Sequence, residues 1–376
     1  MTILALHIYR TYFPDPPGGL QEAIRQITIS TKSFGIESKV FALSPHPTPN
    51  LITLEGVDIV RSRSWATLAS CDIGGLDSIR RFISLFKEAD VIHYHYPWPF
   101  ADFMNLLGQQ PKPKVMTYHS DIVRQNILGK LYNPLMRHTL KTMDRVIATS
   151  SAYTQTSPTL SKYVNPERIR VIPLGIDENS YSHTTSETST RFSLKSHVPF
   201  FLFIGVLRYY KGLHTLIEAA TQVNASIIIA GTGQEDARLR RKAELCNATN
   251  VIFAGQITNA EKIALLKACC ALVLPSHLRS EAYGMVLVEA SMFSKPMISC
   301  EIGTGTSFIN KDQETGFVVP PESPIILAKK MNALLTDNEL NKSFGRAARQ
   351  RYETYFSGPA LGKSYADLYY EVLAKK

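Results

Sequence analysis

The chain has 376 residues, of which 44% are hydrophobic and 19% charged, and its formal net charge at pH 7 is +9. This composition excludes a disordered protein, and the length exceeds the size at which one hydrophobic core stops growing, so we expect two domains. The excess of basic residues is spread over both halves of the chain. The sequence has no zinc finger, RNP stretch or basic helix, which argues against nucleic-acid binding. Scattered basic charge favours a phosphate-bearing ligand or loose attraction to an anionic membrane face.

The chain carries no sequence signal for a membrane span or for disulfides. No apolar stretch approaches the roughly 20 residues that cross a bilayer, and the start lacks a basic region followed by a cleavage site. The five cysteines are odd in number and have no metal-type spacing: Cys71, Cys246, Cys269, Cys270 and Cys300. We therefore expect reduced thiols in a cytoplasmic protein.

Short β-branched runs alternate with amphipathic helical stretches from end to end. Strands are predicted in the first half at residues 2–8, 39–43, 57–60, 90–93, 114–118, 145–149 and 170–173. In the second half they are predicted at residues 200–205, 226–230, 251–253, 271–274, 296–299 and 316–319. Unbroken apolar strands that alternate with helices indicate an α/β protein whose parallel sheets are covered on both faces.

A polar stretch rich in Ser and Thr divides the two halves. We predict a first doubly wound domain over residues 1–176, a linker over 177–198, a second domain over 199–355 and a terminal helix over 356–376. Ligands of such sheets bind beyond the carboxyl ends of the strands. We therefore look for the chemistry in the loops that face a cleft between the domains.

Gly18 and Gly19 stand between a predicted strand and a helix in HIYRTYFPDPPGGLQEAI. Paired glycines let the backbone approach a ligand, and the helix N-terminus that follows offers N–H groups to an anion. Plain turn chemistry is an equally good explanation. The pair does not form a G-x-G-x-x-G, which counts against a dinucleotide cofactor.

Arg208 and Lys211 follow a buried strand and precede a helix in FIGVLRYYKGLHTLIEAA. Two cations beside a helix N-terminus favour a diphosphate. The alternative is a pair of solvated basic residues. Their place between the carboxyl end of a strand and the start of a helix favours the binding site.

Glu281 and Glu289 stand eight positions apart in SEAYGMVLVEA, and we predict the first in a loop and the second inside the helix that follows. Eight residues of continuous helix span roughly 12 Å. The carboxyl pairs of glycosidases lie only about 5–9.5 Å apart, so the spacing argues against a local acid–base pair. It favours two acceptors that bind different ends of one elongated ligand, with two unrelated surface carboxylates as the alternative.

The first half holds further candidates. His119 follows a strand in MTYHSDIVRQN, a position at which a histidine is more often a satisfied structural residue than a catalytic one. His93 and His95 lie two apart on a strand, and we expect their side chains on opposite faces, against joint metal ligation. The aromatic residues around them are candidates for a saccharide groove or for packing above the strand end: Tyr94, Tyr96 and Trp98. No D-x-D stands where it would hold Mg²⁺, and we predict no metal.

The ordered set of PPGGLQEAI, IPLGID, GVLRYYKGL, AGTGQ and the E-x₇-E of Glu281 and Glu289 resembles the retaining glycosyltransferases of family 4 over essentially the whole chain. The resemblance implies the GT-B fold, with two Rossmann-like domains facing across a cleft. It implies that the C-terminal domain holds a sugar nucleotide, that the N-terminal domain holds the acceptor, and that the last helix crosses back to the N-terminal domain.

Roles for single residues also come from this resemblance. Arg208 and Lys211 would hold the diphosphate and stabilise it as the leaving group, Glu289 would bind the ribose and Glu281 the transferred sugar. The catalytic candidates are then His119, Arg208, Lys211 and Glu281. The other donor contacts are backbone N–H groups and loops: Gly18, Gly19, the base-flanking stretch that ends at Ile257, Ala282, Tyr283, Gly284 and Met285. Asp121 and Arg124 are acceptor-side candidates.

RYYKGL, SEAYGMVLVEA, HYHYPWPF and TYHSDIVRQ look closest to bacterial mannosyl- and D-rhamnosyltransferases that build polysaccharide O-chains. This resemblance implies hexose transfer from GDP-mannose to a lipid-linked saccharide in O-antigen biosynthesis, without a metal or cofactor. The alternatives are a GDP-D-rhamnose or UDP-sugar transferase and a sugar-nucleotide epimerase. The enzyme would act in the cytoplasm, loosely bound to the inner membrane face or to other glycosyltransferases.

Overall fold

The structure, a computed structural model, describes residues 2–15, 18–68, 71–108, 111–122, 126–181 and 199–375. The chain divides into two compact units, one of Met1–Asp177 with Gly358–Lys376 and the other of Glu178–Ser357. Arg124 and most of the predicted linker, residues 182–198, lie outside the described residues.

The first unit is built on a nine-stranded sheet in the order β3-β4-β2-β1-β6-β7-β8-β9, with β5 paired to β4. The strands are β1 (Ile3–Ile8), β2 (Ile36–Ser44), β3 (Leu51–Leu54), β4 (Val57–Leu68), β5 (Cys71–Gly74), β6 (Val91–Tyr96), β7 (Lys114–Tyr118), β8 (Arg145–Ala148) and β9 (Ile169–Val171). Every residue of β6 and β7 is buried, as expected of central strands between two helix layers. The predicted parallel sheet is therefore confirmed.

Two short antiparallel strands, β3 and β5, are absent from the sequence prediction. No residue of β3 is buried, so this edge strand lacks the apolar run that reveals a core strand. It is joined to β4 through Glu55 and Gly56, both with positive φ (53° and 78°), as a two-residue hairpin turn that matches strand twist requires.

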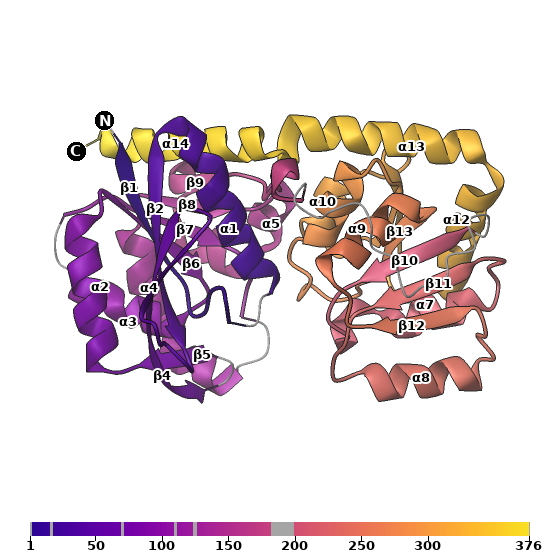
Figure 1. The fold of residues 1–376 in the computed structure, drawn as a ribbon, viewed down its shortest axis with the longest axis horizontal. Helices are drawn as coiled ribbons and strands as arrows, with labels where there is room; N and C mark the ends of the chain where they lie inside the picture. Colours follow the sequence, from indigo (N-terminus) through magenta and orange to yellow (C-terminus); the bar gives the residue numbers. More distant parts are fainter. Residues whose placement is uncertain are drawn as a thin grey trace. The chain divides into compact units, whose positions relative to one another are not determined.

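The helices of the first unit are α1 (Gly19–Thr31), α2 (Leu76–Glu88), α3 (Pro99–Leu107), α4 (Asn126–Thr142), α5 (Ser151–Thr156), α6 (Pro158–Tyr163) and the C-terminal α14 (Gly358–Leu373). Figure 1 shows α14, in yellow, beside α1, in indigo, and the two helices pack together. A Cβ on Gly362 would stand 2.0 Å from the carbonyl oxygen of Ser30, so a glycine permits this close approach.

The second unit has a six-stranded parallel sheet in the order β12-β11-β10-β13-β14-β15. The strands are β10 (Phe200–Ile204), β11 (Ser226–Ala230), β12 (Val251–Gly255), β13 (Ala271–Leu274), β14 (Met297–Cys300) and β15 (Gly316–Val319). Counted from β10 this is the Rossmann order 3-2-1-4-5-6. The order reverses between β10 and β13, so the loops that follow these two strands flank the crevice in which ligands of such sheets bind.

The helices of the second unit are α7 (Leu213–Ala220), α8 (Asp236–Leu245), α9 (Asn259–Ala268), α10 (Met285–Met292), α11 (Thr306–Ile309), α12 (Pro324–Thr336) and α13 (Asn338–Arg351). A π-helical turn, Tyr352–Phe356, follows α13, and the chain leaves the helix at Ser357. In the part of the chain that the structure describes, no helix is long and apolar enough to cross a membrane.

Candidate functional site

The loop after β10 brings the two predicted cations to the point where the strand order reverses. A short 3₁₀ turn, Tyr209–Lys211, leads through Gly212 into α7. Gly212 has a φ of 67°, and a Cβ there would stand 2.0 Å from the carbonyl oxygen of Pro275, just after β13. The loops after β10 and β13 therefore touch, and only glycine fits at the contact.

Lys211 and Glu281 form an ion pair across these two loops, between Nζ and Oε2. Only 12% of the lysine and 10% of the glutamate side chain are exposed, and Ser276 Oγ donates to the same carboxylate oxygen at 3.0 Å. Burial acts to lower the pKa of Lys211, but attraction to the Glu281 carboxylate outweighs it and raises that pKa. The site thus holds a charged, oriented ammonium.

Glu289, inside α10, repeats this arrangement with a different lysine. Its Oε1 accepts from Lys262 Nζ on α9 at 2.6 Å and from Tyr181 Oη at 2.5 Å. Only 10% of its side chain is exposed, so both carboxylates are buried and the alternative of two surface carboxylates is wrong. Within the described residues, Glu281 Oε1 and Glu289 Oε2 have no hydrogen-bond partner, so each carboxylate keeps one oxygen available to a ligand.

The segment between the two glutamates is only partly helical. As predicted, Glu281 lies in a loop and Glu289 in a helix, but α10 begins only at Met285, so the spacing of a continuous helix does not apply. Gly284 caps the helix with a φ of 90°. The Leu287 N–H bonds to the Gly284 carbonyl, but the N–H groups of Met285 and Val286 have no backbone acceptor among the described residues, so they can donate to an anion.

Arg208 and Ile257, two other predicted site residues of the second unit, do not take part in these two hydrogen-bonded ion pairs. Arg208 is exposed and makes no ion pair or side-chain hydrogen bond with any described residue. Ile257 is half-buried and lies two residues after β12. The structure therefore joins Lys211 with Glu281 directly and gives Arg208 and Ile257 no protein partner that fixes a role.

In the first unit, His119 ends a chain of buried imidazoles. His119 Nε2 lies 3.0 Å from His95 Nδ1, and His95 Nε2 lies 3.1 Å from His7 Nδ1. Burial lowers the pKa of both His7 and His119 to about 3, and burial with repulsion from the neighbouring histidines lowers the pKa of His95. All three are therefore neutral near pH 7, and His119 Nδ1 has no hydrogen-bond partner among the described residues.

The prediction that His93 and His95 point to opposite faces is wrong. Their ring centroids lie 4.2 Å apart in a stacked arrangement, because residues two apart on a strand share a face. His93 Nδ1 meets Tyr369 Oη of α14 and Nε2 meets Thr117 Oγ1, both at 2.7 Å. The nitrogens of these strand histidines are thus occupied by neighbouring side chains.

The loop after β1 places Gly18 and Gly19 at the start of α1. Gly18 is the N-cap in an extended conformation, and Gly19 is the first helical residue. A Cβ on Gly19 would meet no atom within 4 Å, and one on Gly18 would meet only the end of Gln21. Packing inside the first unit therefore does not require this glycine pair.

Asp121 and the three aromatic candidates of the first unit have structural roles. The Asp121 carboxylate accepts from the hydroxyls of Tyr118, Ser157 and Tyr153 at 2.9, 2.7 and 3.1 Å. The aromatic candidates for a saccharide groove are all 1–2% exposed: Tyr94, Tyr96 and Trp98. They belong to the core, which decides the open alternative in favour of packing.

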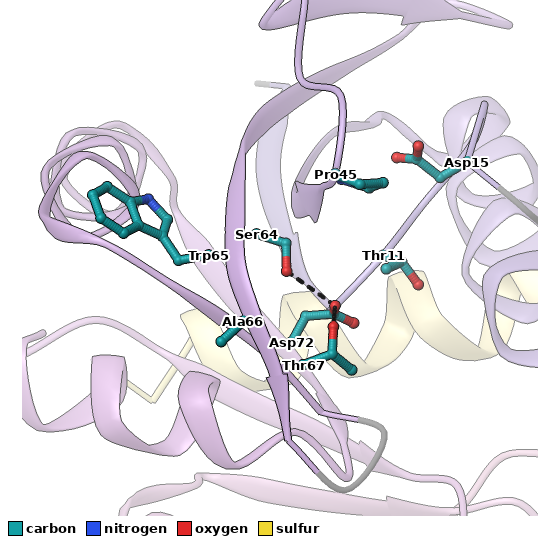
Figure 2. A pocket seen from close by; sticks show the side chains of 8 residues that line it. All are labelled: Thr11, Asp15, Pro45, Ser64, Trp65, Ala66, Thr67 and Asp72. Carbon is teal, nitrogen blue, oxygen red and sulfur yellow. Dashed lines mark hydrogen bonds between the residues drawn. The ribbon is translucent and has the colours of Figure 1, made fainter.

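A pocket of about 490 Å³ in the first unit has no counterpart in the sequence prediction. It is lined by Thr11, Asp15, Pro45, Ser64, Trp65, Ala66, Thr67 and Asp72. Figure 2 shows Ser64 and Thr67 turned toward Asp72, to which they donate at 3.0 and 2.9 Å, whereas the ring of Trp65 points to the other side of the strand. These residues come from separate segments without a motif, so only the fold could assemble them.

Sequence comparison gives matches over both units. Residues 17–180 match the family described as Glycosyltransferase Family 4, and residues 186–351 match that described as Glycosyl transferases group 1. The D-rhamnosyltransferase WbpZ of Pseudomonas aeruginosa is 42% identical over 94% of this chain and 92% of its own length. The O-antigen chain mannosyltransferase C of Escherichia coli is 37% identical over 99% of both chains.

Solved structures agree with the architecture. Sucrose-phosphate synthase from Thermosynechococcus elongatus superposes with a TM-score of 0.80, at 22% identity and over 100% of both chains. Anabaena HepE in complex with UDP superposes with a TM-score of 0.76, at 20% identity and over 99% of this chain and 100% of that one. At these identities the likeness concerns the fold alone.

Proposed function

Since the chain belongs to the family 4 glycosyltransferases, with the GT-B fold of two Rossmann-like domains, we propose that it is a retaining hexosyltransferase of O-antigen biosynthesis. Its donor in this proposal is GDP-mannose and its acceptor is a lipid-linked saccharide. The proposal is supported by a mannosyltransferase relative of matching length. It rests also on one feature of the second unit, the Lys211–Glu281 pair.

The Lys211–Glu281 pair supports the proposal because of its position in the fold and because it leaves one carboxylate oxygen available to a ligand. Lys211 stands at the reversal of the strand order, three residues from Arg208, which forms no ion pair with any described residue. Glu281 holds the ammonium with Oε2 and keeps Oε1 for another donor. A cation next to a buried acceptor suits a sugar diphosphate, which brings negative charge and hydroxyl groups together.

The proposal assigns the donor contacts to individual residues. Arg208 and Lys211 bind the diphosphate, Glu281 Oε1 accepts from a sugar hydroxyl, and Glu289 Oε2 accepts from the ribose. The backbone N–H groups of residues 282–285 face the phosphates and the sugar, and Ile257 flanks the base. As potential ligand contacts on the first unit, the proposal keeps the helix start at Gly18 and Gly19 and the Nδ1 atom of His119.

In the proposed reaction the acceptor hydroxyl attacks the anomeric carbon from the side on which the diphosphate leaves. The bond from this carbon to the phosphate oxygen breaks, and that oxygen takes the proton of the acceptor. Negative charge grows on the β-phosphate as the bond breaks, so Arg208 and Lys211 stabilise the transition state more than the ground state. No step in this proposal needs a metal ion or a cofactor.

D-rhamnose from GDP-D-rhamnose is the second candidate for the transferred sugar. It is favoured by the D-rhamnosyltransferase relative, which is 42% identical against 37% for the mannosyltransferase. The two sugars differ at C6, where mannose has a hydroxyl and rhamnose a methyl group. A site that hydrogen-bonds this hydroxyl rejects the sugar that lacks it, so the choice is open to a direct competition experiment.

The acceptor in this proposal binds the first unit, and the pocket beside β4 and β5 offers suitable groups. Its wall combines Thr11, Ser64, Thr67 and the carboxylates of Asp15 and Asp72, which are partners for saccharide hydroxyls. The net charge of +9 would assist loose docking to an anionic membrane that carries the lipid-linked acceptor.

The test has a binding part and a product part. We expect GDP to raise the melting temperature more than UDP or ADP, because a ligand of the folded state stabilises it. Incubation with GDP-mannose, GDP-D-rhamnose or UDP-glucose and lipid-linked acceptors should then lengthen the saccharide by one sugar type, with an α-anomeric product from an α-linked donor. Sugar-nucleotide isomerisation or hydrolysis without an extended acceptor would overturn the proposal.

A further inference from the structure

A group of potential metal ligands lies in the second unit, beside the loop that contains Lys211. His214 is in the first turn of α7, His277 is in the loop after β13, and Glu322 is in the turn between β15 and α12. One ligand atom from each lies within 4.8 Å of the others. His214 Nε2 and Glu322 Oε1 are 3.7 Å apart.

His277 is the anomaly in this group. The residue is 8% exposed, and neither ring nitrogen has a hydrogen-bond partner among the residues that the structure describes. Buried polar atoms nearly always have one, and a neutral imidazole has both a donor and an acceptor to satisfy. Its ring is held edge-on by Tyr209 and His214, with centroids 4.9 and 5.1 Å away. The protein thus orients this imidazole while giving its nitrogens no partner.

We propose that His214, His277 and Glu322 bind a divalent transition metal ion, with Zn²⁺ the best match to two imidazoles and one carboxylate and with water completing the tetrahedron. Zn–N and Zn–O bonds of about 2.0–2.1 Å put tetrahedral ligand atoms roughly 3.3 Å apart. The 3.7 Å between His214 and Glu322 is close to this value. The side chain of Glu322 is 60% exposed and can therefore move to close the remaining gap.

The contrast with the other histidine group of the protein strengthens this assignment. His7, His93 and His95 also bring ligand atoms within 4.8 Å of one another. There, however, the ring nitrogens contact other histidines, Tyr369 and Thr117. Among the described histidines, only His277 has two buried ring nitrogens without a hydrogen-bond partner, so one of them is available to a metal ion.

Metal binding would cross-link the two loops that carry the Lys211–Glu281 pair. His214 stands three residues after Lys211, and His277 stands four residues before Glu281. A metal ion would fix both loops and the turn at Glu322 without touching a reacting atom. The proposal does not rest on the proposed function, since metal binding can be measured without any donor or acceptor.

The experiment is a metal titration of chelator-treated, full-length protein. We expect one equivalent of Zn²⁺ by calorimetry and a tetrahedral visible spectrum with Co²⁺. The melting temperature should rise by about 3 °C or more at saturating Zn²⁺. His277→Ala and Glu322→Gln should each weaken Zn²⁺ binding by about tenfold or more. The second variant alters an exposed side chain, so the test survives if His277→Ala misfolds.

The matched control is His46→Ala, because His46 is exposed and lies in the first unit; it should bind Zn²⁺ like the wild type. Zn²⁺ binding that persists in both His277→Ala and Glu322→Gln would overturn the proposal, as would the absence of binding in the wild type. A loss of GDP affinity in His277→Ala, without Zn²⁺ binding by the wild type, would also overturn it and assign His277 to the donor.

Discussion

In the first unit His7, His95 and His119 are hydrogen-bonded in a row, whereas in the second His277 is also buried but neither of its ring nitrogens has a partner among the described residues. Glu281 and Glu289 of the second unit are only partly hydrogen-bonded. Each carboxylate uses one oxygen to pair with a lysine, and its other oxygen has no partner among the described residues. A saturated polar cluster stabilises and positions, while an unsaturated one is prepared for a ligand. Among the described residues, the imidazole row of the first unit leaves only His119 Nδ1 unpaired, whereas the second unit leaves both nitrogens of His277 and one oxygen of each glutamate unpaired.

The largest expected effect comes from Lys211→Ala. In the proposed reaction the change removes a cation from the leaving diphosphate, so we expect kcat to fall by about 10²–10³. It also leaves Glu281 buried without its ion pair, which should lower the free energy of unfolding by about 3–5 kcal/mol. Turnover and urea unfolding measure the two effects. Lys262→Ala is the matched control, because it breaks the equivalent pair at Glu289 and should lower kcat far less; equal losses of kcat would refute the distinction.

His95→Leu tests the saturated cluster of the first unit. The variant leaves His7 Nδ1 and His119 Nε2 without partners, and each orphaned buried nitrogen should lower the free energy of unfolding by about 1–3 kcal/mol. Urea denaturation checks this, with His138→Leu as a control at an exposed histidine outside the cluster. A His95→Leu protein as stable as the wild type would show that the imidazole chain contributes nothing.

The same cluster makes stability depend on pH. His7 and His119 have pKa values near 3 in the folded protein, against about 6.5 when unfolded. Between these values the unfolded chain binds more protons, so stability is full above pH 6.5 and falls as the pH drops toward 3. Each histidine should contribute about 1.4 kcal/mol per pH unit. Urea unfolding from pH 7 to 4.5 should show a shallower slope in His7→Gln; an unchanged slope would contradict the prediction.

The smallest expected effect separates the two carboxylates. Glu289→Gln keeps the shape of the side chain but weakens the acceptor that we propose for the ribose, so GDP affinity should fall by about tenfold, or about 1.4 kcal/mol. Glu281→Gln should change GDP affinity little and lower kcat, because GDP lacks the transferred sugar. Calorimetry with GDP and steady-state turnover distinguish these results, and identical profiles for both variants would remove the separate roles.

Much of the fold could be read from local sequence patterns. Buried runs such as FFLFIG and KVMTY predict strands because parallel strands are apolar on both faces. The same reasoning fails for β3, an edge strand without a buried residue. The pocket beside Asp72 was equally invisible, since its wall joins β4, β5 and two loops that share no motif.

By itself, the sequence determined the alternation of strands and helices, the loop positions of Arg208, Lys211 and Glu281, and the place of Glu289 on a helix. It could not determine that Lys211 pairs with Glu281, 70 positions away, or that Lys262 pairs with Glu289. Only the tertiary structure decided these pairs, because the strand order sets which loops meet and no local pattern encodes that order. Burial of these four charged side chains holds them in two oriented ion pairs. In each pair, one carboxylate oxygen has no partner among the described residues.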